Sequence, residues 1–197
     1  MLLTLQGELE GLGFALDDAQ LEQLAGHWAL VKEWNRRMNL TAIMSDSRAA
    51  SLHYRDSLEL LKVVGAGRVV DLGSGAGFPG VPLAIARPAQ HIVLVEPRRK
   101  RASFLRTVKN RLQLSQVEVL EARSEHAPPQ LFDWAVTRAT FSDRDDLLAC
   151  LQWLRPGGQL VAMRAAADAS HQSTQRHRYE VDKSSRILES FVRGESG

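Results

Sequence analysis

Four glycines follow a short apolar run near the middle of the chain. Residues 71–80 read Asp-Leu-Gly-Ser-Gly-Ala-Gly-Phe-Pro-Gly. Glycines in such a loop permit tight turns and let backbone N–H groups approach a ligand closely. Glu96 ends the next apolar run, 19 residues beyond Gly77, and an acid at that distance accepts hydrogen bonds from both hydroxyls of a ribose. The spacing predicts a site for a cofactor that contains adenosine.

The loop alone leaves two cofactors open. Residues 75–80 match the Gly-x-Gly-x-x-Gly pattern of dinucleotide sites, so an NAD-linked oxidoreductase is one interpretation. Asp71 favours S-adenosylmethionine, because a carboxylate just before the first glycine could orient the loop or face the cofactor's ammonium group through water. No hydride-transfer machinery is evident in the sequence, which favours the same choice.

The chain before this loop has a helical pattern. A helix is expected to begin near Asp17, where acids favour the positive end of a helix dipole. Apolar residues then recur three or four apart, at Leu21, Leu24, Trp28, Val31 and Trp34. A second helix is expected over residues 47–62, with Leu52, Leu58 and Leu61 facing inward. We therefore divide the chain into a helical cap, residues 1–66, and a cofactor-binding domain, residues 67–197, packed as one unit.

From Arg68 onward, apolar runs alternate with helical patterns. Strands are expected at residues 68–72, 91–96, 117–120, 132–137 and 159–163, the last one after a turn at Pro156-Gly157-Gly158. Helices are expected near Val81, over 99–112 and over 145–154. This alternation predicts an α/β fold with a doubly wound, parallel sheet. The tail beyond Ala165 is expected to add one helix and two strands, the last near residues 187–192.

Composition excludes several classes of protein. Of the 197 residues, 44% are hydrophobic and 24% are charged, which is typical of a globular protein. The single cysteine, Cys150, excludes an internal disulfide framework and a cysteine-rich zinc site. His171 and His177 stand in a polar tail, and we expect no metal site. We expect a cytoplasmic protein without a membrane span, and nothing in the sequence demands more than a monomer.

The charges are unevenly distributed along the chain. The first 67 residues hold six basic and nine acidic residues, whereas the remainder holds 19 basic and 14 acidic ones. Residues 98–111 contain seven cations and no acid. Such a block is either a solvated helix face or a surface that meets phosphates.

Six short motifs stand in order between residues 25 and 165. They are Trp34-Asn35-Arg36-Arg37-Met38-Asn39-Leu40-Thr41, His53-Tyr54-Arg55-Asp56-Ser57, residues 71–82, Lys100-Arg101 with Phe104-Leu105, Arg123-Ser124-Glu125, and Arg138-Ala139. Residues 71–77 resemble motif I of class I methyltransferases. The whole set is similar to one family, the bacterial small-subunit ribosomal RNA guanine-N7 methyltransferases, also called glucose-inhibited division protein B.

The resemblance implies a Rossmann-like class I fold with an N-terminal helical extension and S-adenosylmethionine as cofactor. It implies small-subunit ribosomal RNA, or a pre-ribosomal particle, as partner. It also places Arg138 beside the cofactor and the target base. The predicted cofactor-binding residues are then Asp71, Gly73, Ser74, Gly75, Gly77, Phe78, Glu96, Ser124, Glu125 and Arg138. The cations predicted to bind RNA are Arg98, Lys100, Arg101, Arg123 and Arg164.

The sequence departs from the family pattern in the last third of the chain. Arg164-Ala165 stands where the family usually shows Lys-Gly, and Glu189-Ser190 is expected to interrupt the last apolar strand. These departures keep a non-catalytic RNA-binding or ribosome assembly factor open as an alternative.

The implied reaction depends little on acid–base catalysis. Guanine N7 already has an in-plane lone pair, so methylation removes no proton from it and needs no general base. The main task is to position N7 against the sulfonium methyl group. Arg138 could donate to the base edge at O6 or to a phosphate, with a structural salt bridge as the alternative. His53 could cap a helix or pair with Asp56.

Overall fold

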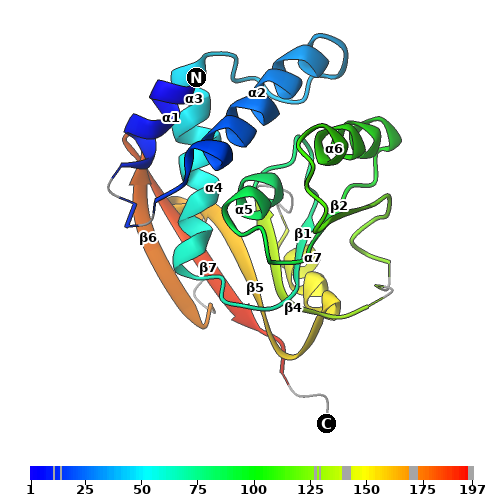
Figure 1. Ribbon diagram of the computed structural model, residues 1–197. Helices are drawn as coiled ribbons and strands as arrows, with labels where there is room; N and C mark the ends of the chain where they lie inside the picture. Colours follow the sequence, from blue (N-terminus) through cyan, green and yellow to red (C-terminus); the bar gives the residue numbers. More distant parts are fainter. Residues whose placement is uncertain are drawn as a thin grey trace.

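One sheet crosses the molecule, with helices packed on both of its faces (Figure 1). The computed structural model describes residues 1–197 apart from 11, 14, 127, 129, 139–142, 169–172 and 195–197. The predictions that involve Ala139 and His171 lie outside the described residues. In the described part of the chain, no helix combines the length and apolar character that crossing a bilayer requires.

The sheet has seven strands in the order β3-β2-β1-β4-β5-β7-β6. The strands are β1 (Val69–Leu72), β2 (Ile92–Val95), β3 (Val117–Leu120), β4 (Phe132–Arg138), β5 (Leu154–Ala165), β6 (Gln175–Val181) and β7 (Ser184–Val192). The first five strands of this order are parallel, whereas β7 is antiparallel to both β5 and β6. The order confirms the predicted α/β fold with a doubly wound, mostly parallel sheet.

Two hydrophobic layers cover the sheet. On one face, α5 (Gly80–Ala86) and α6 (Arg99–Arg111) pack together with the N-terminal helices. On the other face, α7 (Arg144–Ala149) and the 3-10 turn η3 (Cys150–Trp153) pack over the central strands. β1 and β2 are therefore buried on both sides, which explains why all of their residues except Asp71 are apolar.

The N-terminal helices share their core with the sheet. They are α1 (Leu2–Leu9), α2 (Asp18–Met38) and the helical segment 46–62. α2 begins as expected, because Asp17 caps it and forms a reciprocal capping box with Gln20. The Gln20 side chain also donates to the carbonyl of Ile85 in α5, at 2.9 Å. Trp28 and Tyr54 lie in the same buried cluster as Val69 of β1, so the N-terminal helices and the sheet contribute to one hydrophobic cluster.

The segment 46–62 is helical but not one regular α-helix. It consists of α3 (Asp46–Ala49), a π-helix η1 (Ala50–Arg55), α4 (Asp56–Leu58) and a 3-10 turn η2 (Glu59–Lys62). The expected inward face was partly wrong. Leu58 is buried, but Leu52 and Leu61 are only half-buried, and Leu60 is fully buried. A π-helix makes wider turns than an α-helix, so residues beyond it rotate relative to an α-helical prediction.

The end of the chain differs from the prediction in three places. β5 begins at Leu154 and runs through Pro156-Gly157-Gly158, where the sequence predicted a turn before the strand. β5 has three more residues than β4 in this stretch, because Phe132 pairs with Leu154 and Trp134 pairs with Gln159. Glu189 and Ser190 do not interrupt β7, because both lie within its ladder and are buried. Among the tail residues that the structure describes, the expected helix is represented by a short 3-10 turn, η4 (Ala166–Asp168).

Removing the N-cap residue of α2, Asp17, tests how much this capping contributes to stability. Asp17→Ala removes the acceptor that binds the Gln20 N–H at 2.8 Å. We expect the free energy of unfolding to fall by about 1 kcal/mol, the usual cost of losing an N-cap. Urea unfolding at equilibrium measures it, with Glu22→Ala, an exposed position of the same helix, as the control. Equal losses in the two variants would contradict a role for the cap.

Candidate active site

The glycine loop leaves the sheet between β1 and α5. The N–H groups of Gly73 and Ser74 both donate to the carbonyl of Val95 in β2, at 2.9 and 3.0 Å. Gly73, Gly75 and Gly77 have φ values of 79°, 56° and 91°, a region that side chains with a Cβ rarely adopt. A Cβ on Gly77 would come within 2.7 Å of Val81. The loop therefore depends on glycine, as the sequence predicted.

Glu96 ties this loop to the start of α6. One carboxylate oxygen accepts the N–H of Gly75 at 3.0 Å, and the other accepts the N–H of Arg98 at 2.9 Å. The side chain is buried against the protein but lines a cavity at the carboxyl end of the sheet. Each oxygen keeps a second lone pair, so the carboxylate can accept further hydrogen bonds from a ligand.

Asp71 lies beneath the loop and does not line the cavity. One of its oxygens accepts the N–H of Gly80 at 3.0 Å. The other is buried and has no hydrogen-bond partner among the described residues. Burial raises the pKa of Asp71 to about 7, against hydrogen bonds that lower it. Asp71 therefore orients the loop through its bond to Gly80. This is the first of the two roles that the sequence suggested for it.

Two adjoining cavities form a groove along the strand ends. The first has a volume of about 440 Å³, and its wall includes Gly73, Ser74, Gly75, Phe78, Glu96 and Arg138. The second has about 430 Å³ and is lined by Arg123, Ser124 and Glu125, with Cys150 at its edge. Gly73, Pro97 and Arg98 belong to both walls. The structure thus brings together the predicted cofactor-binding residues except Asp71 and Gly77, neither of which lines the two cavities.

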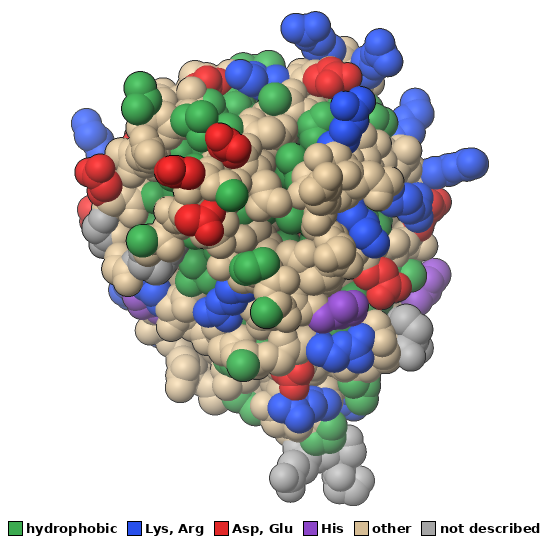
Figure 2. Space-filling view, viewed as in Figure 1, with side chains coloured by type: hydrophobic (Ala, Val, Ile, Leu, Met, Phe, Trp, Pro, Cys, Tyr) green, Lys and Arg blue, Asp and Glu red, His purple; other side chains and the backbone are tan. Residues whose placement is uncertain are grey.

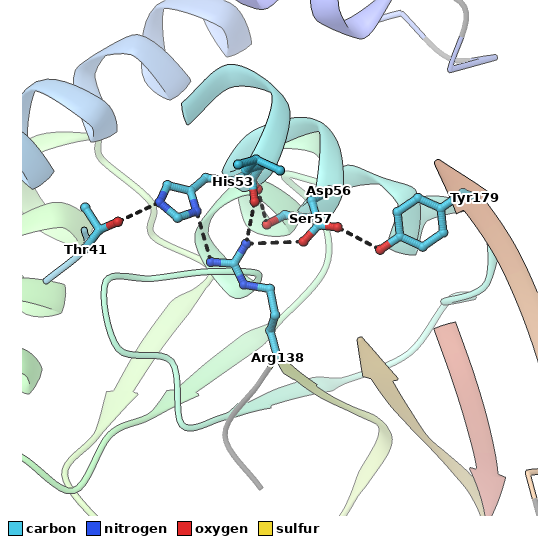
Figure 3. A network of polar contacts seen from close by, with 7 residues as sticks. Thr41, His53, Asp56, Ser57, Arg138 and Tyr179 are labelled. Atoms are coloured by element: carbon cyan, nitrogen blue, oxygen red, sulfur yellow. Dashed lines mark hydrogen bonds and ion pairs between the residues drawn. The ribbon is translucent and has the colours of Figure 1, made fainter. Parts of the chain in front are cut away.

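Arg138 sits in a polar network that three distant parts of the chain supply (Figure 3). Its guanidinium donates to Asp56 Oδ2 at 3.4 Å, to the carbonyl of Leu52 at 3.1 Å and to His53 Nδ1 at 3.3 Å. It also lies over the ring of Phe78, 5.1 Å from the ring centroid. Asp56 Oδ1 accepts the phenol O–H of Tyr179 at 2.8 Å. Arg138 is thus both a salt-bridge partner and part of the cavity wall.

This network corrects the prediction for His53. The sequence suggested a pair between His53 and Asp56, but Asp56 binds Arg138 and Tyr179 instead. His53 contacts Thr41 and Arg138, and its ring stacks on Phe78 with centroids 4.5 Å apart. Tyr179 was missed altogether, because it follows Asp56 by 123 residues and no local pattern marks it.

Sequence reasoning also missed His27 of α2. It is fully buried under the glycine loop, where Nε2 lies 2.9 Å from the carbonyl of Ala76 and Nδ1 lies 3.1 Å from the Tyr54 hydroxyl. A carbonyl only accepts, so Nε2 carries a proton and donates it. Burial lowers the pKa of His27 to about 4. The cap therefore holds the loop through a neutral histidine.

The predicted RNA-binding cations fall into three places. Arg98 and Arg101 line the 440 Å³ cavity, and Arg123 lines its neighbour. Lys100 lines a different groove of about 710 Å³ between α2 and α6. Arg164 is separate from these four, since its side chain faces Glu189 at 3.9 Å and donates to the carbonyl of Asp168. The described residues show no ion pair between Arg123 and Glu125.

The expectation that the sequence has no hydride-transfer machinery overlooked one Tyr-x-x-x-Lys spacing, at Tyr179 and Lys183. Tyr179 lies on β6, and Lys183 is exposed in the tight turn that precedes β7. The Tyr179 hydroxyl is bound to Asp56. The spacing therefore forms no tyrosine–lysine pair beside the cofactor groove.

Comparison with known proteins decides between the alternatives. Residues 20–195 match the sequence profile of a family described as rRNA small subunit methyltransferase G. The chain belongs to this family. A Ribosomal RNA small subunit methyltransferase G from Geobacter sp. (strain M21) is 42% identical over 163 residues, which cover 80% of this chain and 75% of that protein. The protein of the same name from Nitrosospira multiformis is 38% identical over 162 residues, covering 78% and 74%.

Solved structures support the fold of this methyltransferase family. A SAM dependent methyltransferase from Aquifex aeolicus aligns with a TM-score of 0.59 at 19% identity, over 78% of this chain and 97% of that one. TYW2 from P. horikoshii, solved in complex with MeSAdo, aligns with a TM-score of 0.57 at 11% identity, over 78% and 65%. At such identities the likeness concerns the fold alone, which is the class I methyltransferase fold. Neither the NAD-linked enzyme nor the non-catalytic factor is favoured by these relatives.

His27 should make the stability of the protein depend on pH. In the unfolded chain its pKa is 6.5, and in the fold it is about 4. Its contribution to the free energy of unfolding is thus complete above pH 6.5 and is lost as the pH falls through 4. A difference of about 2.5 pKa units limits that loss to about 3 kcal/mol.

His27→Gln keeps a donor for the Ala76 carbonyl but cannot titrate. We expect the variant to lose less stability than the wild type between pH 7 and pH 4.5, measured by urea unfolding at both values. His126→Gln, at an exposed position, is the matched control and should follow the wild type. If His27→Gln lost as much stability as the wild type, the neutral histidine would not be a source of acid sensitivity.

Proposed function

We propose that this protein transfers a methyl group from S-adenosylmethionine to N7 of one guanine in small-subunit ribosomal RNA. The observation that carries the proposal is one cavity whose wall holds both Glu96, after β2, and Arg138, at the end of β4. Ligands of doubly wound sheets bind at these carboxyl ends. Membership of the rRNA small subunit methyltransferase G family supports the choice of ribosomal RNA.

The groove fits an adenosine-containing sulfonium cofactor. Glu96 would hold the ribose hydroxyls, and Ser124 and Glu125 would flank the adenine in the second cavity. Gly73 and Phe78 would meet the methionine part, beside a loop that needs positive φ angles. In its ionised form, the buried Asp71 carboxyl beneath the loop would favour positive charge nearby. The cofactor supplies an electrophilic methyl group on a positively charged sulfur.

The residues of the cavity suit positioning better than proton transfer. Both oxygens of Glu96 already accept backbone N–H groups. Burial and the nearby Arg138 lower the pKa of His53 to about 3, which makes its ring a poor base. Arg138 is held by Asp56 and stacks over Phe78, so it fixes the cavity wall. Guanine N7 needs no base, and such a wall can orient it by contact alone.

A positively charged surface next to the cavity favours a polyanionic substrate. Figure 2 shows Lys and Arg side chains gathered over α6, whereas Asp and Glu side chains gather on the opposite side of the same face, where α1 and the beginning of α2 lie. The groove between α2 and α6 is lined by four cations, Arg36, Arg37, Arg99 and Lys100, together with Trp34 and one acid, Glu33. None of these four cations forms an ion pair with a described residue, so phosphates can bind them without displacing an acid. Trp34 adds an aromatic surface for stacking a base.

We also propose that the protein acts as a monomer in the bacterial cytoplasm. The groove is built by a single chain, which suits a monomer. A ribosomal RNA substrate, either free or in a pre-ribosomal particle, suits a bacterial protein of the cytoplasm. Arg98, Arg101 and Arg123 would approach phosphates near the target base, and Lys100 would do so farther along α6.

Nucleoside analysis of ribosomal RNA tests the proposal. RNA from cells that lack the gene should miss one 7-methylguanosine of the small subunit, and the purified protein with S-adenosylmethionine should restore it. Mass spectrometry measures both. An unchanged nucleoside composition in the deletion strain would overturn the proposed function.

Glu96→Ala should weaken cofactor binding by about 1–3 kcal/mol, the usual loss when a charged hydrogen-bond acceptor is removed from a buried site. Titration calorimetry with S-adenosylmethionine measures it. Glu96→Gln keeps one carbonyl acceptor and should lose less. Unchanged affinity in Glu96→Ala would exclude the ribose-binding role of this residue.

Arg99→Glu combined with Lys100→Glu should lower methylation of ribosomal RNA at least tenfold, because the α2–α6 groove would then repel phosphates. Affinity for S-adenosylmethionine should stay unchanged, since neither residue lines the cofactor groove. Lys109→Glu with Arg111→Glu, at the far end of the same helix, changes the charge equally and is the control. A similar loss in the control pair would assign the effect to net charge rather than to this groove.

A further inference from the structure

Thr41, which lines the cavity, is held by four hydrogen bonds, two at its backbone and two at its hydroxyl oxygen. The Asn35 side chain holds its backbone on both sides, accepting the Thr41 N–H at 2.9 Å and donating to the Thr41 carbonyl at 3.0 Å. The Thr41 hydroxyl oxygen accepts the N–H of Ile43 at 3.0 Å and lies 2.9 Å from His53 Nε2. These contacts explain why an asparagine stands six residues before the threonine in this stretch of the chain.

The direction of the bond between His53 and Thr41 follows from Arg138. A guanidinium has donors only, so Arg138 donates to His53 Nδ1 at 3.3 Å and that nitrogen accepts. A neutral imidazole carries one proton, which must then lie on Nε2. Burial keeps the ring neutral, with a pKa of about 3. His53 therefore donates from Nε2 to the Thr41 hydroxyl oxygen (Figure 3).

These bonds leave the hydroxyl of Thr41 able to donate one hydrogen bond but not to accept another. Both of its lone pairs are filled, by His53 and by Ile43. Its proton has no acceptor among the residues that the structure describes. Thr41 lines the same cavity as Phe78, Glu96 and Arg138, so the proton is available to a ligand there. The side chain acts as a donor and cannot also accept.

We propose that the Thr41 hydroxyl donates a hydrogen bond to O6 of the target guanine and so distinguishes guanine from adenine. The proposal rests on the proposed function, because it assumes a purine that enters with N7 toward the cofactor. On that edge guanine presents two acceptors, N7 and O6, whereas adenine presents N7 and an amino donor. The amino group of adenine would meet a hydroxyl oxygen whose lone pairs are already occupied.

His53 and Arg138 act through Thr41 in this scheme and are positioning residues. Arg138 fixes the tautomer of His53, and His53 fixes the rotation of the Thr41 hydroxyl. The bonds of Arg138 to Leu52, His53 and Asp56 point toward the helical segment 46–62, so the O6 contact that the sequence suggested for Arg138 is transferred to Thr41. A donor held in place before the base arrives needs no reorganisation.

A substrate that lacks O6 tests the proposal. Small-subunit ribosomal RNA is assembled with 2-aminopurine, which is guanine without O6, at the position that the wild-type protein methylates. Wild type and Thr41→Val are compared on this RNA and on the guanine RNA. On guanine, Thr41→Val should lower kcat/KM about 10- to 100-fold, the usual range for losing a base-edge hydrogen bond. On 2-aminopurine, the two proteins should differ by less than about threefold.

Three controls keep the result interpretable. Thr41→Ser retains the hydroxyl and should restore most of the rate. Thr107→Val removes a hydroxyl that donates to its own helix at Ser103, and it should behave as wild type. Titration calorimetry with S-adenosylmethionine reports whether each variant still folds and binds the cofactor.

The outcomes separate the two proposals. An equal loss of rate for Thr41→Val on both RNAs, or a loss of cofactor affinity that accounts for the slower rate, would overturn the role at O6. Full activity of Thr41→Val on guanine would overturn it too. If the wild-type protein methylates no guanine in ribosomal RNA, the proposed function itself fails and the role of Thr41 falls with it.

Discussion

A buried guanidinium is the constraint on which the site depends. Arg138 is 16% exposed at its side chain, and burial lowers its pKa while Asp56 opposes that shift. Leaving such a cation without a partner would cost several kcal/mol, so Asp56 must stay in place. Asp56 is itself 1% exposed and is bound by Tyr179 of β6. One charge at the end of β4 thereby connects the sheet, the helical segment 46–62 and the C-terminal hairpin.

A second connection joins the cap to the glycine loop. His27 donates from α2 to Ala76, and Phe78 packs against the rings of His27, His53 and Tyr54 with centroids 5.0, 4.5 and 5.2 Å apart. The loop has little packing of its own, because glycines give it no side chains. Its conformation is therefore determined from outside, by His27 of the cap, which donates to Ala76, and by Asp71 of β1, which accepts from Gly80. This is a physical reason for the cap to be built into the same core as the sheet.

Local chemistry made part of this structure predictable from sequence. β1 and β2 are buried on both faces, so the sequence marks them as apolar runs. It therefore also located the glycine loop between them and Glu96 after β2. The partners of Arg138 and His27 were not, since Arg138 and Asp56 lie 82 residues apart and His27 and Ala76 lie 49 apart. The π-helix η1 shifted the buried face around Leu60, because the period of 3.6 assumed for the segment does not hold there.

The charges of α6 show how such a site can favour its substrate before contact. Arg99, Lys100 and Arg101 occupy the first turn, where the helix dipole is positive and the sequence supplies no acid. Each cation there costs about 0.3–1 kcal/mol, and Glu96 relieves only the start of the helix by accepting the N–H of Arg98. In the folded protein, these cations therefore repel one another and the positive end of the helix dipole. Bound phosphates would reduce this repulsion. A polyanion then gains affinity from the same residues that slightly destabilise the free protein, so the basic block is better explained by an anionic substrate than by a solvated helix face.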